Sequence, residues 1–496
     1  MYNAQSSLHT TSATVCHSTA RSDLTVWLTM AIFAIVTLLL VSTDSWTHNL
    51  WDHHDSATFF ASGKAWMSGM VPYVDFSDSK GPLLWLIYGV GYLLSPRTVH
   101  GVFWITCLNY VFVFWWLFKT ARIYLADNYL AVFASMLTSL AIFYPWVRYE
   151  TRAEDFTLFF LVWGLYHVCR LLHDDRIDER RQTLRASVVL GVGMAATLLI
   201  KYNASAILGV MALYVLHFAW RQGTGLWHAL GAMACSSAVF LLPFVIYMLS
   251  VGCLDNFIYE YFVVNIDVVA RQHALMRHPI YLLWGHRYTM GIYLLACGLS
   301  ALAAAWLARR YRGFVLVAFL ATILLTVSNA FWLYYYAICA PFVLFGVVAV
   351  LCHLDASRVR SISGCVVYGA LCIALVFATH SAHGAAWSWS DTPEQRAFDR
   401  YATLMAQIQR PRVIYYGMHG MALGIAAHSL PGCRYWVSQS GATPDMDADQ
   451  RRAIEARQAD FVVVLSDYEP AAWLASLGYH RHLGDPSLPV VLYNLR

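Results

Sequence analysis

The chain has 496 residues, of which 59% are hydrophobic and only 12% are charged. Soluble domains are about 25% charged, so this composition excludes an ordinary soluble protein and indicates one that crosses a bilayer several times. The formal net charge of +4 is modest, and we expect the lipid bilayer rather than nucleic acid as a partner.

The N-terminal part of the chain combines a polar tail with an apolar anchor. Residues 1–24 are rich in Ser, Thr and His without a periodic apolar pattern, so we expect a disordered cytoplasmic tail. Residues 25–43 are apolar and approach the ~20 residues that span a bilayer. Because no convincing cleavage site of small residues follows, this run is predicted to be an uncleaved anchor.

Apolar runs recur along the chain and predict a polytopic α-helical membrane protein with about eleven spans. The expected spans are 25–43, 101–118, 129–145, 156–172, 187–200, 203–220, 229–250, 288–308, 314–328, 335–352 and 362–380. The run 83–94 is too short and is predicted to be a helix at the membrane interface. Because the run 187–200 is short, the number of spans stays open at the pair of runs 187–200 and 203–220.

Basic residues cluster in short segments that would all lie on one side of the membrane. These residues are Arg21, Lys119, Arg122, Arg170, Arg176, Arg180, Arg181, Arg185, Arg221, Arg309, Arg310, Arg312, Arg358 and Arg360. Because Lys and Arg favour the cytoplasmic side, the N-terminus is predicted inside and the C-terminus outside.

The chain changes character after the last apolar run. Residues 412–416, 461–465 and 489–493 are strand-like, and residues 393–409 and 449–458 are amphipathic. This alternation predicts a small α/β domain over residues 384–496, on the outer side of a membrane domain spanning residues 25–383.

The long first outer loop carries unusual charges between two apolar segments. It contains Asp55, Asp75, Asp78 and Lys80. A carboxylate at a membrane surface can accept a proton from a hydroxyl nucleophile, and a lysine can bind a phosphate. The alternative is that Asp75, Asp78 and Lys80 form a salt-bridge network that only stabilises the loop.

The order of residues in this loop carries a family resemblance. Asp55 opens an aromatic amphipathic stretch, Gly69-x-x-Pro72-Tyr73 ends it, and Lys80-Gly81-Pro82-Leu83 closes the loop. This order resembles integral-membrane GT-C glycosyltransferases, nearest to bacterial relatives of protein O-mannosyltransferases and lipid A aminoarabinose transferases. In those families Glu usually follows the Asp and the loop closes with Lys-Pro-Pro-Leu. Here Ser56 replaces that Glu, and Gly81 replaces the first Pro.

The resemblance implies a glycosyltransferase of a bacterial inner membrane. Its donor would be a polyprenyl-phosphate sugar, and its acceptor a hydroxyl of a glycan, lipid or protein at the outer face. Asp55 would be the general base of an inverting reaction. Lys80, Lys201 and Arg287 would bind the donor phosphate, and Tyr73, Tyr334 and Tyr335 would pack against lipid or sugar.

Further charges are expected at the outer ends of predicted spans. Glu154 and Asp155 stand where the family places a second acidic site, with Asp75 and Asp78 as other candidates for binding the acceptor. The alternative for Glu154 and Asp155 is a solvated turn with local ion pairs, which would also suit the helix dipole. Lys201 lies between two apolar runs, where it either contacts the donor phosphate or extends to the interface.

No metal site is predicted, although a requirement for a divalent cation stays open. His53-His54-Asp55 lacks the spacing of helical metal ligands. The absence of a nucleotide-binding motif favours a membrane-borne donor. The competing class is a transporter or flippase of lipid-linked saccharides, which would place ionisable groups near mid-bilayer and often shows inverted repeats. No internal repeat is visible in the sequence.

Overall fold

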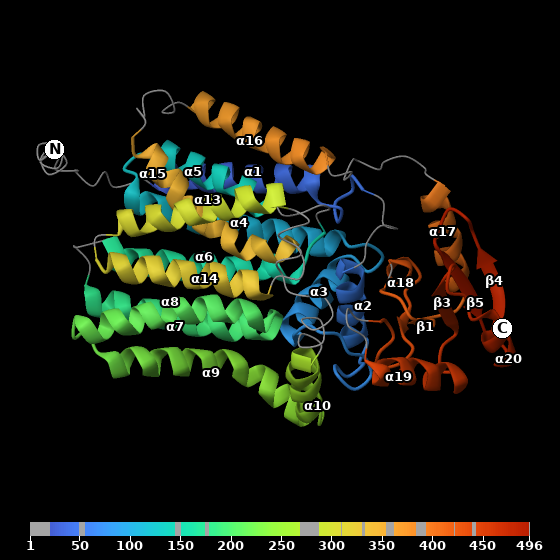
Figure 1. Ribbon diagram of the computed structural model, residues 1–496. Helices are drawn as coiled ribbons and strands as arrows, with labels where there is room; N and C mark the ends of the chain where they lie inside the picture. The colour runs from blue at the N-terminus through green and yellow to red at the C-terminus, as the bar shows by residue number, and fades with distance from the viewer. Residues whose placement is uncertain are drawn as a thin grey trace, which may run out of the picture.

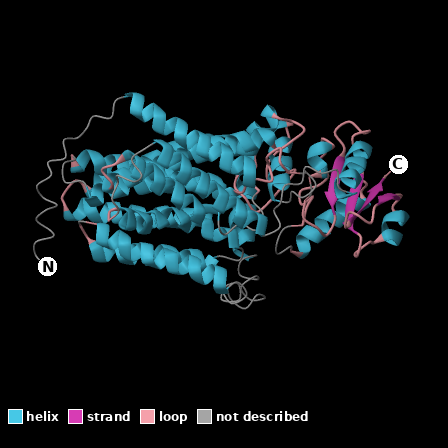
Figure 2. Cartoon of the chain, turned by 90° about the horizontal axis from the view of Figure 1, so that it is seen from above, coloured by secondary structure: helices cyan, strands magenta, loops and turns pink. Residues whose placement is uncertain are grey.

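Apolar helices lie side by side in the computed structural model and form a bundle (Figures 1 and 2). The structure describes residues 20–48, 55–143, 150–173, 178–267, 287–308, 310–329, 333–353, 362–382, 393–420, 422–438 and 443–495. The bundle contains α1 (Ala20–Val41), α4 (His100–Tyr124), α5 (Asn128–Phe143), α6 (Ala153–His173), α7 (Glu179–Ile200), α8 (Tyr202–Arg221), α9 (Leu226–Ser250), α13 (Arg287–Leu307), α14 (Arg312–Asn329), the 3-10 helix η3 (Leu333–Val343), α15 (Leu344–Leu351) and α16 (Ile362–Ala382).

Seven helices in the described part are long and apolar enough to cross a membrane. Their spans are Leu24–Val41, His100–Tyr124, Ala153–His173, Glu179–Ile200, Tyr202–Arg221, Leu226–Ser250 and Tyr334–Leu351. Shorter apolar helices coincide with the other predicted spans, at Asn128–Phe143, Gly291–Leu307, Arg312–Thr326 and Val366–Ala378. A polytopic helical membrane protein is thus confirmed, while the count of eleven stays a prediction.

Two short helices lie between the bundle and the C-terminal domain (Figure 1). These are α2 (Asp55–Met67) and α3 (Pro82–Leu94). Helix α3 corresponds to the run 83–94 that is predicted to lie at the membrane interface. The two helices pack closely because each has a glycine at the point of contact. A Cβ on Gly63 of α2 would lie 2.5 Å from the backbone nitrogen of Gly89 of α3. Proline at the first position of α3 suits a helix start.

The end of the loop fits tightly against the bundle at Gly81. Its amide donates a hydrogen bond of 3.1 Å to the carbonyl of Ile200, at the end of α7. A Cβ on Gly81 would lie 2.1 Å from the carbonyl oxygen of Leu199. Glycine is therefore required by the close approach of α7, and a proline here would also lose the amide donor.

The C-terminal domain contains a five-stranded mixed sheet in the order β2-β1-β3-β5-β4. Its elements are α17 (Pro393–Met405), β1 (Arg412–Tyr415), α18 (Leu423–Ala426), β2 (Leu430–Pro431), α19 (Pro444–Glu455), β3 (Phe461–Leu465), α20 (Ala471–Ser476), β4 (His480–Gly484) and β5 (Val490–Asn494). β1 is parallel to β2 and β3, whereas β5 is antiparallel to β3 and β4. The three predicted strands overlap β1, β3 and β5.

Alternate residues of the sheet enter two different cores. Ile414 and Val462 belong to a core inside the domain, whereas Val413 and Tyr415 belong to one shared with α2 and α3. The domain also contacts the π-helix η2 (Tyr259–Val264), which follows α10 (Leu254–Ile258): Glu260 of η2 accepts a hydrogen bond of 2.5 Å from the Tyr435 hydroxyl. The domain is therefore packed onto α2, α3 and the loop that they enclose.

Candidate active site

Asp55 begins α2 and its side chain is 43% exposed. Its Oδ2 lies 3.4 Å from Nε of Arg152, which precedes α6. A carboxylate is stabilised at a helix N-terminus, because the unpaired backbone amides there carry partial positive charge. Asp55 is thus held by a cation and a helix end while part of its surface remains accessible.

Arg152 links Asp55 to two other segments. Its Nη2 lies 2.9 Å from Oε1 of Glu150, and its Cζ lies 3.9 Å from the centroid of the Tyr334 ring in η3. Glu150 in turn accepts hydrogen bonds from the amide and hydroxyl of Ser56, at 3.2 and 3.3 Å. A second carboxylate therefore lies beside Asp55, although Glu does not follow it in the sequence.

Glu154, in the first turn of α6, and Lys201, directly after α7, form a buried ion pair. The Nζ of Lys201 lies 3.5 Å from the centroid of the Tyr335 ring and 5.7 Å from that of Tyr334. The Tyr334 ring thus lies near both Arg152 and Lys201, and Lys201 also lies against the adjacent Tyr335 ring.

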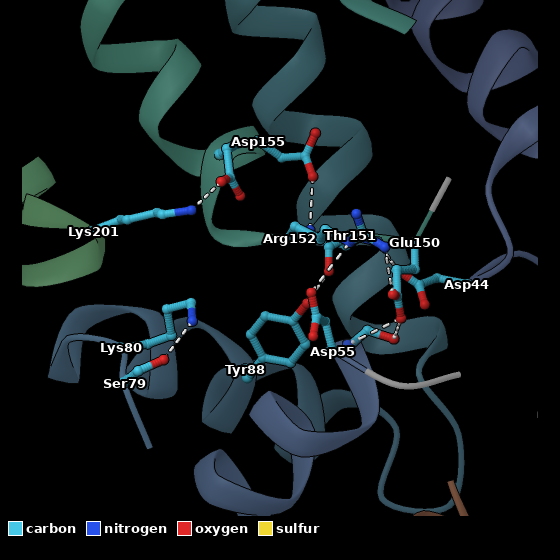
Figure 3. Close-up of polar contacts among 12 residues, drawn as sticks. Asp44, Asp55, Ser79, Lys80, Tyr88, Glu150, Thr151, Arg152, Asp155 and Lys201 are labelled. Atoms are coloured by element: carbon cyan, nitrogen blue, oxygen red, sulfur yellow. Dashed lines mark hydrogen bonds and ion pairs between the residues drawn. The ribbon is translucent and has the colours of Figure 1, made fainter. Parts of the chain in front are cut away.

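Lys80 contributes a further positive charge from the loop. Its Nζ donates to the Ser79 hydroxyl at 2.8 Å and lies 5.5 Å from the centroid of the Phe59 ring. Figure 3 shows Lys80 and Lys201 on the same side of Asp55. The charged cluster is defined here as Asp55, Lys80, Arg152, Glu154, Lys201, Tyr334 and Tyr335.

Several predicted site residues make hydrogen bonds that stabilise local structure. Asp155 is fully buried, accepting from the Tyr110 hydroxyl at 2.6 Å and from the Arg152 amide at 2.7 Å. Asp75 accepts from the Val71 amide at 2.7 Å in an exposed turn. Tyr73 is buried with φ of +64° and donates to the carbonyl of Lys80 at 3.0 Å. These contacts fix the start of α6 and the shape of the loop.

Asp78 has a mixed environment. Its Oδ1 accepts from the Ser79 amide at 2.6 Å, whereas its buried Oδ2 has no hydrogen-bond partner in the described part. No ion pair joins Lys80 to Asp75 or Asp78 among the described residues, so the alternative of a salt-bridge network that stabilises the loop does not form there. Arg287 begins α13, but its side chain lies outside the described residues.

Sequence reasoning did not single out Arg152, Glu150 or Asp44. Asp44 follows α1 and accepts from the Thr151 amide at 2.7 Å, which fixes the segment before α6 (Figure 3). The unusual charge of residues 148–155 was a usable signal for Arg152 and Glu150. Asp44 had no signal beyond its place after the first span.

A cavity of about 230 Å³ adjoins the charged cluster. It lies between α8, α14 and η3 and is lined by Tyr202, Asn203 and Tyr335 together with apolar residues of these helices. Tyr202 follows Lys201 directly, and Tyr335 contacts the Lys201 ammonium group. The cavity therefore extends from the charged end of the bundle between membrane helices.

No cluster of three or more His, Cys, Asp or Glu residues suitable for a metal ion occurs in the described part of the chain. His53 and His54 lie outside the described residues. The possible requirement for a divalent cation stays a prediction.

Solved structures resemble this chain, although no protein-family model and no curated protein sequence matches it. ArnT from Cupriavidus metallidurans, solved bound to undecaprenyl phosphate, superimposes with a TM-score of 0.60 at 13% identity, over 96% of this chain and 99% of ArnT. Arabinofuranosyltransferase AftD from Mycobacteria gives a TM-score of 0.50 at 14% identity, over 96% of this chain and 40% of AftD. The resemblance predicted from the first outer loop is confirmed at the level of the fold: the chain has the fold of GT-C glycosyltransferases.

Proposed function

We propose that the protein is a glycosyltransferase at the outer face of a bacterial inner membrane. It transfers a sugar from a polyprenyl-phosphate donor to a hydroxyl of a glycan, lipid or protein. The main support is the charged cluster, in which the partly exposed Asp55 contacts Arg152, and Arg152 and Lys201 both lie against the Tyr334 ring. Lys80 lies on the same side of Asp55 as Lys201 (Figure 3). The GT-C fold and the undecaprenyl phosphate bound by ArnT also support this donor class.

Asp55 acts as the general base in the proposed reaction. The acceptor oxygen attacks the anomeric carbon while its proton passes to the Asp55 carboxylate. The bond between the anomeric carbon and the phosphate oxygen breaks, and polyprenyl phosphate leaves with the bonding electrons. Because attack and departure occur on opposite faces, the configuration inverts and no covalent intermediate with the protein forms.

Lys201 and Lys80 stabilise the charge that develops on the leaving phosphate. Glu154 orients Lys201 through the buried ion pair, and Tyr335 lies against its ammonium group. Charges fixed before the reaction stabilise a transition state well, since little reorganisation is needed. Arg152 holds the Asp55 carboxylate in place, and Arg287 remains a further candidate for the phosphate.

The isoprene units nearest the phosphate would enter the cavity between α8, α14 and η3. A lipid there would have its phosphate near Lys201 and its apolar tail between membrane helices. Asp78 is a candidate for binding the acceptor substrate through one of its N–H or O–H groups. The Oδ2 of Asp78 is buried and without a hydrogen-bond partner among the described residues.

A transporter or flippase of lipid-linked saccharides is less consistent with this arrangement. Transport routes place ionisable groups near mid-bilayer. In this chain Asp55, Glu154 and Lys201 lie at the end of the bundle nearest α2 and α3. A flippase would move the lipid-linked sugar without releasing polyprenyl phosphate, so product analysis separates the two functions.

The proposal predicts that Asp55→Asn abolishes transfer while the protein still inserts and folds. Loss of a general base typically lowers the rate by about 10²–10⁴-fold. Release of polyprenyl phosphate by the purified protein measures this rate. Asp445→Asn is the matched control, because Asp445 is an exposed acid in the first turn of α19. Near-normal turnover by Asp55→Asn would rule out its assigned role.

The sugar and the acceptor can be identified together in cells. Mass spectrometry of envelope lipids, glycans and glycoproteins from a deletion strain should reveal a missing sugar relative to wild type. Expression of the Asp55→Asn variant should fail to restore it.

A further inference from the structure

A second cavity, of about 810 Å³, lies between α2, the turn after α3 and the C-terminal domain. Lys64, Arg97, Arg410 and His428 line it, together with Asp399 and several uncharged polar residues. None of Lys64, Arg97 and Arg410 has an ion-pair partner in the described part of the chain. The cavity therefore holds an excess of positive charge that the protein does not neutralise.

Lys64 is the most buried of these cations. It is 1% exposed, and its Nζ donates to the carbonyl of Gly424 in α18 at 2.6 Å. An ammonium group has three N–H donors, so this contact satisfies only part of its capacity. Burial lowers the pKa of Lys64 to about 7. An anion in the cavity would supply the missing acceptors and favour the charged form.

Backbone conformation holds two other cavity residues in unusual positions. Arg410 and His428 both have φ of +53°, a left-handed conformation that is unfavourable for residues other than glycine. Arg97 Nε donates to Nε2 of His428 at 3.2 Å, which joins the turn after α3 to the C-terminal domain. Strained residues of this kind are often found in binding sites, where the surrounding structure maintains them.

The cavity also adjoins apolar surface close to the membrane. Arg97 lies three residues before α4, a candidate span, and follows the exposed Leu93 and Leu94 at the end of α3. Exposed leucines beside basic residues fit an amphiphile whose apolar part contacts α3 and whose headgroup reaches the cavity.

We propose that this cavity binds a phosphate-type oxyanion carried by the headgroup of a membrane amphiphile. Lys64, Arg97 and Arg410 bind the oxyanion, and His428 orients Arg97. This site lies at the opposite end of α2 from Asp55 and does not depend on the transfer reaction. It would fix the C-terminal domain against the membrane surface through a lipid rather than through protein contacts alone.

The test uses the full-length protein in nanodiscs made of phosphatidylcholine alone or with phosphatidic acid. The melting temperature should rise with the phosphatidic acid content, and inorganic phosphate should compete with this effect only at higher concentration. Arg97→Gln and Arg410→Gln should each weaken the apparent affinity about tenfold or more, as loss of a charge-assisted hydrogen bond does. Both side chains are exposed in part, so these variants should fold.

Arg457→Gln is the matched control, because Arg457 is exposed, has φ of +56° and lies outside the cavity. Its affinity should match wild type, as should that of Asp55→Asn, which separates this proposal from the proposed function. Stabilisation by phosphatidic acid that is equal in wild type and Arg97→Gln would overturn the site. Binding of inorganic phosphate without any effect of phosphatidic acid would overturn the membrane source of the ligand.

Discussion

Ser56 shows how a missing acid can be supplied from elsewhere in the chain. In the families that the loop resembles, Glu usually follows the first Asp. Here Ser56 donates two hydrogen bonds to Glu150, which lies 94 residues away in the sequence. A carboxylate is therefore present beside Asp55. The sequence showed both residues, but it could not show that the folded chain brings them together.

The buried ion pair of Glu154 and Lys201 leads to a prediction about stability. Removal of one partner leaves the other charge buried and unpaired, which typically costs about 3–5 kcal/mol. Glu154→Gln and Lys201→Met should each lower the melting temperature in detergent, and the double variant should recover most of the loss. The control is Glu179→Gln, whose partner Arg310 lies in a less buried pair.

Activity separates the roles of this pair. The double variant should stay inactive in transfer even where its stability is restored, because the charge that binds the phosphate is lost. Restored turnover in the double variant would show that Lys201 serves only the structure.

At the scale of elements, local patterns predicted the site only in part. Asp55, the loop motif and α3 can be recognised in the sequence because their residues follow one another in the chain. Asp75 and Asp155 were equally conspicuous as acids, yet their carboxylates bind nearby backbone amides. Charge along the sequence marks a functional region, whereas the direction of each side chain depends on packing that the sequence does not display.

Strands illustrate the same limit. β1, β3 and β5 are buried and apolar, so their runs were visible. β2 has only two residues, and β4 reads His-Arg-His-Leu-Gly without an apolar pattern. β2 pairs with β1 and β4 pairs with β5, and these backbone hydrogen bonds stabilise strands whose own side chains show no strand pattern.

The position of Lys64 in α2 predicts a dependence of stability on pH. Burial lowers its pKa from 10.5 to about 7, so between these values the unfolded chain binds more protons than the folded one. Stability should therefore rise with pH in this window, by at most about 1.4 kcal/mol per pH unit, and be lowest below about pH 7. The other charged or titratable groups at this cavity are Tyr92, Arg97, Asp399, Arg410 and His428.

Thermal unfolding from pH 7 to pH 9 in detergent measures this dependence. Burial also lowers the pKa of His428 from its ordinary value of 6.5. This shift also makes stability rise with pH, but it does so below about pH 6.5 and therefore outside the measured range. Lys64→Met should flatten the profile, and Lys119→Met should not. A wild-type stability that falls from pH 7 to pH 9 would contradict the buried, largely neutral state of Lys64.

At the scale of the whole molecule, the ends of α2, α6 and α7 that carry the charged cluster lie on the side of the bundle nearest the C-terminal domain (Figure 1). Arg122, Arg170 and Arg221 are in the last turns of α4, α6 and α8, at helix ends remote from that domain. Because basic residues favour the cytoplasmic side, we expect the cluster and the domain to be outside.

Alkaline phosphatase fusions test this orientation, since the enzyme is active only outside the cytoplasm. A fusion after residue 495 should be active, and a fusion after Arg221 should be inactive. The reverse result would place the charged cluster in the cytoplasm, where nucleotide sugars are available, and would remove the argument for a lipid-borne donor.

The contacts between the loop and the C-terminal domain have a consequence for how the protein is made. The Ser77 amide binds the carbonyl of Arg434, and Lys64 binds that of Gly424. A ribosome produces Asp55, Lys80, Arg152 and Lys201 long before it reaches these partners. A nascent or truncated chain would carry every residue of the cluster and still lack these two contacts of the C-terminal domain with the loop and α2. We therefore expect α2 and the loop to reach their final positions only after the C-terminal domain has been made.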